Sequence, residues 1–117
     1  MELLTLQAVQ GIGGCAEKNY QDWFEALESM IQSVRKLEFD VALIGAGAFG
    51  LPLAAAIKRM GKMGIHIGGS LQLFFGILGK RWEDRGIDKY AVIENWVRPV
   101  PEETPVEARD VEGGCYW

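Results

Sequence analysis

The chain has 117 residues and a mass of 13.0 kDa, which is enough for one compact domain with its own hydrophobic core. Apolar residues make up 49% of it, too many for a disordered protein, and the net charge of -4 argues against a general nucleic-acid binder. The two cysteines, Cys15 and Cys115, lie far apart and predict neither a zinc site nor a disulfide framework. The start, MELLTLQ, lacks the basic region of a signal peptide, so we expect a cytoplasmic protein.

A strand and an amphipathic helix are the first elements that the sequence predicts. Leu3 to Val9 alternates apolar and polar residues and then runs into glycines, which favours a strand. Asn19 is expected to be the N-cap of a helix that runs to about Leu37. Its apolar residues recur every three or four positions, so one face of this helix is expected to pack on a sheet.

The stretch DVALIGAGAFG, residues 40–50, contains the strongest pattern in the chain. Its apolar run VALI is typical of a parallel strand buried on both faces. Gly45, Gly47 and Gly50 then form GxGxxG, the spacing of a dinucleotide-binding turn between a strand and a helix. Such glycines allow a tight turn and the close approach of a ligand, and the alternative is that they serve only the packing of helix on strand.

A helix from Leu51 to Met60 and a third strand from Met63 to Gly68 follow. Ser70 is expected to cap a short, buried, apolar helix that ends near Leu78. Because strands and helices alternate, we predict an α/β fold for residues 1–97, a three-layer Rossmann-like domain with a parallel sheet of about three strands.

The pattern weakens after Gly79. A short helix is expected over Tyr90 to Val97, and residues 98–117 are expected to form an irregular, extended Pro/Glu-rich tail with an aromatic end. Tyr116 and Trp117 are expected to pack on the body of the protein or on a neighbouring subunit, because both rings in water would expose a large apolar surface.

Two uncharged windows, residues 41–57 and 63–79, raise the alternative of a membrane hairpin. Each is 17 residues long, at the short limit for a span, and each is rich in glycine. We therefore expect no membrane span.

Charge is distributed unevenly along the sequence. Residues 41–82 contain five basic residues and no acid, whereas the segments on both sides are net acidic. A ligand of this middle part is expected to be an anion rather than a metal ion held by carboxylates, so we predict no metal site. The sequence does not predict a specific cofactor either.

The candidate binding residues lie in two glycine turns and in the segment that follows them. If the second and third strands are neighbours, both turns open on the same carboxyl edge of the sheet, where ligands of α/β proteins bind. Ser70 and Gln72 are then expected to bind polar groups of a nucleotide-like ligand, and Lys80 and Arg81 its phosphate. The full predicted set is Gly45, Gly47, Gly50, Gly68, Gly69, Ser70, Gln72, Lys80 and Arg81. The alternative is that Gly68 and Gly69 only turn a corner and that the two basic side chains are solvated.

His66, the single histidine, lies near the end of the third strand and is the candidate catalytic residue, as a general base. The sequence names no partner that would set its tautomer, so a structural histidine is the alternative. A redox dinucleotide is disfavoured, because Ile67, Gly68 and Gly69 stand where such sites carry an acid for the ribose.

Residues 40–82 resemble the carboxyl-terminal part of bacterial GT-D-like proteins, relatives of the GT-D-fold glycosyltransferases, and the likeness spans about Trp23 to Trp82. In that family a GAG-type turn is followed by a helix, a Gly-Lys turn and a strand ending in an Asp-Ile-Gly-His-like sequence. The corresponding residues here are Ile44–Gly50, Gly61-Lys62 and His66-Ile-Gly-Gly69. The resemblance implies a Rossmann-like domain that contacts a sugar nucleotide. His66 stands where the transferases carry an acid and Gly69 where they carry a histidine, so those two roles do not transfer.

The sequence is therefore compatible with three candidate functions. The first is a nucleotide or nucleotide-sugar binding domain, incomplete for catalysis because the acidic metal motif of the transferases lies in an amino-terminal half that this chain is expected to lack. Such a domain is expected to be completed by that half or by forming a homo-oligomer. The second is a non-catalytic structural or assembly module, and the third is a small NAD(P)- or FAD-binding oxidoreductase.

Overall fold

The computed structural model describes residues 2–11 and 20–117, which divide into two compact units. The first unit contains the described residues 2–9 and 20–69, and the second contains residues 10–11 and 70–117. The expected N-cap Asn19 and the cysteine Cys15 lie outside the described residues.

Helix α1, Trp23–Arg35, is the first helix of the first unit. It begins later than predicted because Asp22 is the cap: its carboxylate accepts a hydrogen bond from the N–H of Glu25 at 2.9 Å. Glu25 in turn accepts one from the N–H of Gln21 at 2.6 Å. This near-reciprocal pair satisfies two N–H groups at the start of the helix.

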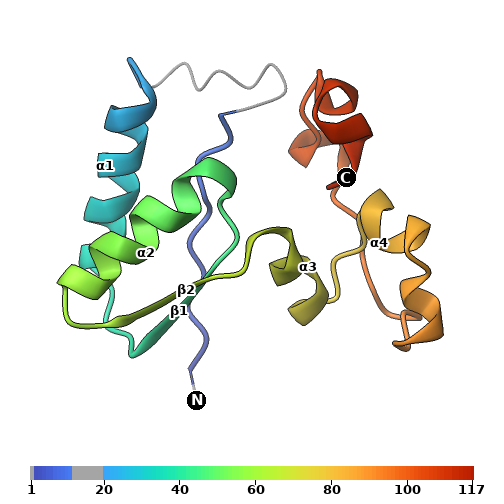
Figure 1. Cartoon of the computed structure of the whole chain (residues 1–117), viewed down its shortest axis with the longest axis horizontal. Coiled ribbons are helices and arrows are strands. Elements are labelled where there is room, and N and C mark those ends of the chain that lie inside the picture. The colour runs from blue at the N-terminus through green and yellow to red at the C-terminus, as the bar shows by residue number, and fades with distance from the viewer. Residues whose placement is uncertain (1, 12–19) are drawn as a thin grey trace. The chain divides into compact units, whose positions relative to one another are not determined.

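The two strands, β1 (Val41–Ile44) and β2 (Met63–His66), pair in parallel, with Val41 opposite Met63 and Ile44 opposite His66 (Figure 1). Helix α2, Gly50–Arg59, connects them after a 3-10 turn over Gly47–Phe49. The mixed helix and strand content, the parallel pairing and the helix after the glycine turn agree with the sequence prediction of an α/β fold.

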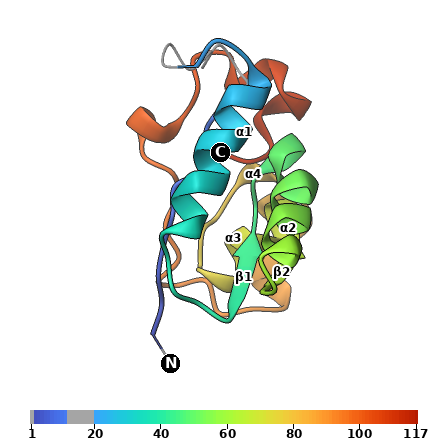
Figure 2. The ribbon, with the colours of Figure 1, turned by 90° about the vertical axis from the view of Figure 1, so that its left-hand side faces the viewer.

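The core of the first unit lies where α1 and α2 meet one face of this strand pair. Both views of the ribbon show the two helices as neighbours (Figures 1 and 2). The buried residues are Ala26, Met30, Val34, Ile44, Phe49, Leu53 and Ile57. Trp23 adds a ring stacked on Phe49, with 5.1 Å between the ring centroids. Gly64 lets α2 approach β2, since a Cβ atom there would lie 3.1 Å from the backbone of Ala54.

The prediction of a three-stranded, three-layer Rossmann-like domain is wrong. Among the described residues the sheet has two strands, and Leu3 to Val9 is not one of them. The N–H of Val9 donates to the sulfur of Met30 at 3.4 Å, and Ala8 and Val9 pack against the core through their side chains. Leu3, Leu4 and Leu6 are exposed, so only the end of this segment packs on the core and the alternation before it does not correspond to strand pairing.

The prediction that β1 is buried on both faces is also wrong. Ile44 faces the helices and is buried, whereas Val41 is 49% exposed and its partner Met63 is 55% exposed. Leu43 and Ile65, the next pair on that face, are exposed as well. Both helices contribute to the core on the Ile44 side, so neither helix of the first unit covers the opposite, apolar face of the strand pair.

The second unit consists of short segments: helix α3, Leu71–Phe74, helix α4, Lys80–Asp84, and several 3-10 turns. Ile77 and Val97 form a parallel bridge, and the N–H of Leu78 donates to the carbonyl of Val97 at 2.7 Å. The bridge replaces the helix expected over Tyr90 to Val97, because Val97 takes part in strand-like pairing.

The helix expected from Ser70 to Leu78 is shorter than predicted and is not buried. It ends at Phe74, which is 69% exposed, and Gly76 adopts a left-handed φ of +64° that turns the chain toward the bridge. Ser70 stands at the predicted cap position but its side chain makes no capping hydrogen bond.

Residues 98–117 are not extended either. They contain 3-10 turns at Pro101–Glu103, Ala108–Asp110 and Glu112–Gly114. In the part of the chain that the structure describes, no helix has the length and apolar character needed to cross a membrane.

Candidate functional site

The glycine turns of the first unit start side by side at the carboxyl edge of the strand pair. Ile44 and His66, the last residues of β1 and β2, are register partners, and the N–H of Ile67 donates to the carbonyl of Ile44 at 3.0 Å. The condition on which the sequence prediction depended, that these two strands are neighbours, is therefore met. This edge holds Gly45, Gly47, Gly68 and Gly69 in the two turns and Gly50 at the start of α2.

Two of these glycines have backbone conformations that favour glycine. Gly47 has a φ of +48° and Gly68 a φ of +56°, and a Cβ atom on Gly47 would meet nothing within 4 Å. The N–H groups of residues 45–48, 68 and 69 make no hydrogen bond to another described residue. The edge therefore presents a group of unpaired backbone donors beside open space, as anion-binding turns do.

Gly50 has a different role, which His66 explains. A Cβ atom on Gly50 would lie 2.1 Å from ring atoms of His66, so the ring occupies the place of a side chain there. The Nδ1 atom of His66 lies 3.2 Å from the carbonyl oxygen of Ile44. Because a carbonyl only accepts, this contact places the proton of a neutral ring on Nδ1 and leaves Nε2 as its acceptor. The tautomer-setting partner that the sequence left unnamed is thus a backbone group of the neighbouring strand.

The other predicted ligands, Ser70, Gln72, Lys80 and Arg81, belong to the second unit. The amide of Gln72 is bonded at both ends: its nitrogen donates to the carbonyl of Tyr116 at 2.8 Å, and its oxygen accepts from the indole of Trp82 at 3.0 Å. This side chain connects two parts of the second unit, α3 and the chain end, around the buried Trp82.

Arg81 is surrounded by residues of the chain end. Its guanidinium forms an ion pair with Glu112, donates to the sulfur of Cys115 at 3.1 Å and lies 4.4 Å from the ring centroid of Tyr116. The contact with Tyr116 is the main cause that raises the pKa of Arg81. Burial raises the pKa of the Cys115 thiol, and its hydrogen bond to Glu112 raises it further, so this thiol is not activated as a nucleophile.

The chain end packs closely on the start of α4. The N–H groups of Lys80 and Arg81 donate to the carbonyls of Trp117 at 3.2 Å and Cys115 at 2.9 Å. A Cβ atom on Gly79 would lie 2.8 Å from the carbonyl oxygen of Tyr116. The prediction that the aromatic end packs on the body of the protein is confirmed within the second unit.

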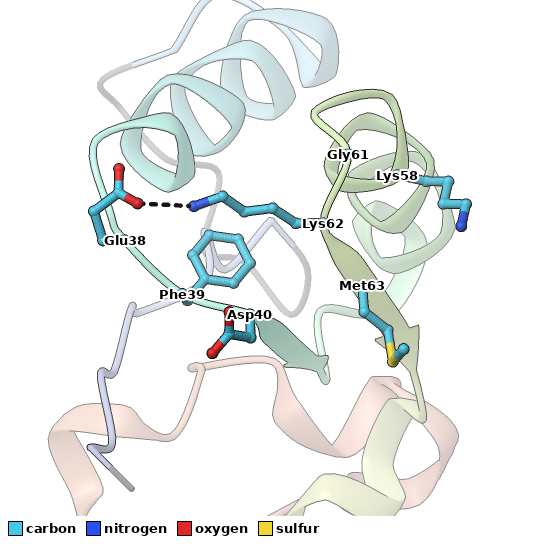
Figure 3. Close-up of a pocket in the computed structure, with 7 residues that line it drawn as sticks. All are labelled: Glu38, Phe39, Asp40, Lys58, Gly61, Lys62 and Met63. Atoms are coloured by element: carbon cyan, nitrogen blue, oxygen red, sulfur yellow. Dashed lines mark ion pairs between the residues drawn. The ribbon is translucent and has the colours of Figure 1, made fainter.

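A hollow of about 450 Å³ lies near the amino ends of the strands of the first unit, opposite the glycine turns. It is lined by Glu38, Phe39, Asp40, Lys58, Gly61, Lys62 and Met63 (Figure 3).

The ammonium group of Lys62 lies 3.6 Å from the Glu38 carboxylate and 4.4 Å from the ring centroid of Phe39, and it donates to the carbonyl of Leu37 at 3.2 Å. Figure 3 shows Lys62 reaching toward Glu38 while Lys58 points away. Lys62 thus connects the segment after α1 to the start of β2. Its partners lie more than twenty residues away in the sequence, so no local sequence pattern indicates this role.

In the described ranges 2–11 and 20–117, no three His, Cys, Asp or Glu side chains come together in a way that could hold a metal ion. Comparisons of the sequence with protein families and curated proteins, and a search of solved structures, found no match.

Proposed function

We propose that the first unit binds a nucleotide at the carboxyl edge of its parallel strand pair. The observation that carries the proposal is the group of unpaired N–H donors on residues 45–48, 68 and 69, which two adjacent turns bring to one edge. Backbone donors in such turns bind phosphate oxygens, and the amino end of the ten-residue helix α2 adds a favourable field for an anion. The resemblance to GT-D-like proteins favours a nucleotide sugar.

The predicted residues have different roles in this nucleotide site. Gly45, Gly47, Gly68 and Gly69 contact the phosphate through their backbone, whereas Gly50 makes room for His66. The Nε2 atom of His66 is the nearby polar side-chain group that remains available to a ligand. The proposal does not depend on Gln72 or Arg81, whose polar groups are engaged within the second unit.

Gly47→Ala and Gly61→Ala form a matched pair of variants that tests the proposal. Both glycines have a left-handed φ, +48° and +81°, with nothing within 4 Å of an added Cβ, so both substitutions introduce similar backbone strain of about 1–2 kcal/mol. Gly61, however, follows the C-terminal end of α2, at the opposite edge.

The measurement is the melting temperature with increasing UDP-glucose, UMP and NAD. A ligand at a hundred times its Kd stabilises the folded state by about 2.7 kcal/mol. We expect UDP-glucose or UMP to stabilise the wild type and Gly61→Ala, and to lose most of that effect in Gly47→Ala. Absence of stabilisation by all three compounds, or equal stabilisation of the two variants, would contradict the proposal. Stabilisation by NAD alone would favour the oxidoreductase instead.

A second candidate function, self-assembly, is favoured by one specific observation. The face of the strand pair that the helices do not cover presents Val41, Leu43, Met63 and Ile65, four exposed apolar side chains in two register pairs. Contiguous apolar surface of this kind marks interaction sites. We infer that a second copy of the chain covers this face, which makes the protein a homo-oligomer.

A further inference from the structure

A second hollow, of about 600 Å³, lies entirely within the second unit. We propose that it binds a small phosphorylated compound, such as a sugar phosphate. This site is independent of the nucleotide proposal, because it shares no residue with the glycine turns of the first unit. Its volume falls within the range of about 300–1,000 Å³ that is usual for small-molecule sites.

The charge of the lining favours an anion. The charged side chains of its lining, Lys80 and Arg109, are both basic, and they come from segments almost thirty residues apart. The ammonium group of Lys80 is held beside the hollow by the carbonyl of Gly113 at 3.4 Å. Arg109 forms no ion pair with another described residue, so its guanidinium is available for a bidentate contact with phosphate.

The acids near this hollow lie outside its lining. Glu112 is compensated by Arg81 and also accepts hydrogen bonds from Cys115 and Tyr116, at 3.4 and 3.3 Å. Glu107 and Asp110, which flank Arg109 in the sequence, are exposed to water and are screened by salt. They weaken the attraction of a phosphate, so we expect a millimolar affinity that falls as salt is added.

The backbone turn beside the two basic residues contains unpaired N–H donors. Glu112, Gly113 and Gly114 have three successive left-handed φ values, +49°, +68° and +75°. The N–H groups of Glu112 and Gly113 donate to no other described residue, and a Cβ atom on Gly113 would meet open space. Successive N–H groups in a turn converge on an anion. Trp117 completes the lining with an apolar surface against which a sugar ring can pack.

Nuclear magnetic resonance of the ¹⁵N-labelled full chain, titrated with ribose 5-phosphate at low salt, tests this inference. We expect the amide signals of Glu112 and Gly113, whose N–H groups are unpaired, to shift with the phosphate ester and not with ribose. Arg109→Gln is expected to weaken this binding about tenfold, the loss typical of one charge-assisted contact. Lys89→Gln, which removes an exposed positive charge outside the lining of the same unit, should change it less than twofold.

Three outcomes would overturn the inference: no shifts at millimolar ester, equal shifts with ribose, or equal weakening by the two substitutions. If the shifts appear at residues 45–48 instead and are unchanged by Arg109→Gln, the phosphate binds in the first unit, which supports the nucleotide site and rejects this one. Because Arg109 is exposed, Arg109→Gln should keep the wild-type melting temperature, which confirms that the variant is folded.

Discussion

Gly50 is a single residue of the GxGxxG motif whose role here is to make room for a side chain and not to contact a ligand. The third glycine of GxGxxG faces the ring of His66, and a Cβ atom there would lie 2.1 Å from two ring atoms. We expect Gly50→Ala to lower the free energy of unfolding by about 1–3 kcal/mol, the usual effect of overpacking. Urea denaturation followed by circular dichroism measures it.

Removing the ring gives the matched control for this prediction. In the double variant Gly50→Ala/His66→Ala the added methyl has room, so its destabilisation should be smaller than the sum of the two single effects, with a coupling of about 1 kcal/mol or more. Additive effects would show that Gly50 is required for another reason, such as direct contact with a ligand.

Some residues of the candidate site could be predicted from the sequence, whereas the contacts of its polar side chains could not. The turn glycines were predictable, because GxGxxG stands between a strand pattern and a helix pattern. The partners of the polar side chains were not, since His66 bonds a backbone carbonyl 22 residues away and Arg81 pairs with Glu112 at a separation of 31. Contacts of this kind depend on the path of the chain, and no local pattern encodes them.

At the scale of an element, α1 depends on a cap that lies after the predicted one. The Asp22 carboxylate accepts from the N–H of Glu25 at 2.9 Å and is exposed. We expect Asp22→Ala to lower the free energy of unfolding by about 0.5–2 kcal/mol, because a donor in the first turn loses its partner. Asp22→Asn, which keeps a capping oxygen, is the matched control and should retain most of the stability. Equal losses in both variants, measured in urea, would assign the effect to charge rather than to the cap.

The sequence predicted elements correctly where their local pattern was clear and misplaced those whose ends depend on tertiary pairing. The period of α1 and the GxGxxG before α2 placed these helices within a few residues, and the apolar run placed β1. The helix expected to reach Leu78 ended at Phe74, because Gly76 allows a left-handed turn that starts the bridge between Ile77 and Val97. Tertiary pairing overrides local preference in such segments.

At the scale of the whole molecule, the main difference between sequence and structure is how much of the sheet is covered. The apolar run VALI predicts burial on both faces, yet both helices contribute to the core on the Ile44 side. A parallel sheet with one open apolar face is unusual, because parallel sheets are normally covered on both sides. A two-stranded sheet is also marginal without further packing. Both facts favour a partner that completes the fold.

We predict that the whole protein self-associates through the apolar face of the strand pair that the helices do not cover. Light scattering after size exclusion should give the wild type a mass above the 13.0 kDa of one chain. Leu43→Lys places a charge on the open face, where Leu43 pairs with Ile65, and should shift the protein to monomer. Leu51→Lys is the matched control, because Leu51 is 70% exposed on α2 and outside that face, so this variant should keep the wild-type mass. A wild type that stays monomeric at high concentration, or a Leu51→Lys variant that dissociates as fully as Leu43→Lys, would contradict assembly through β1 and β2.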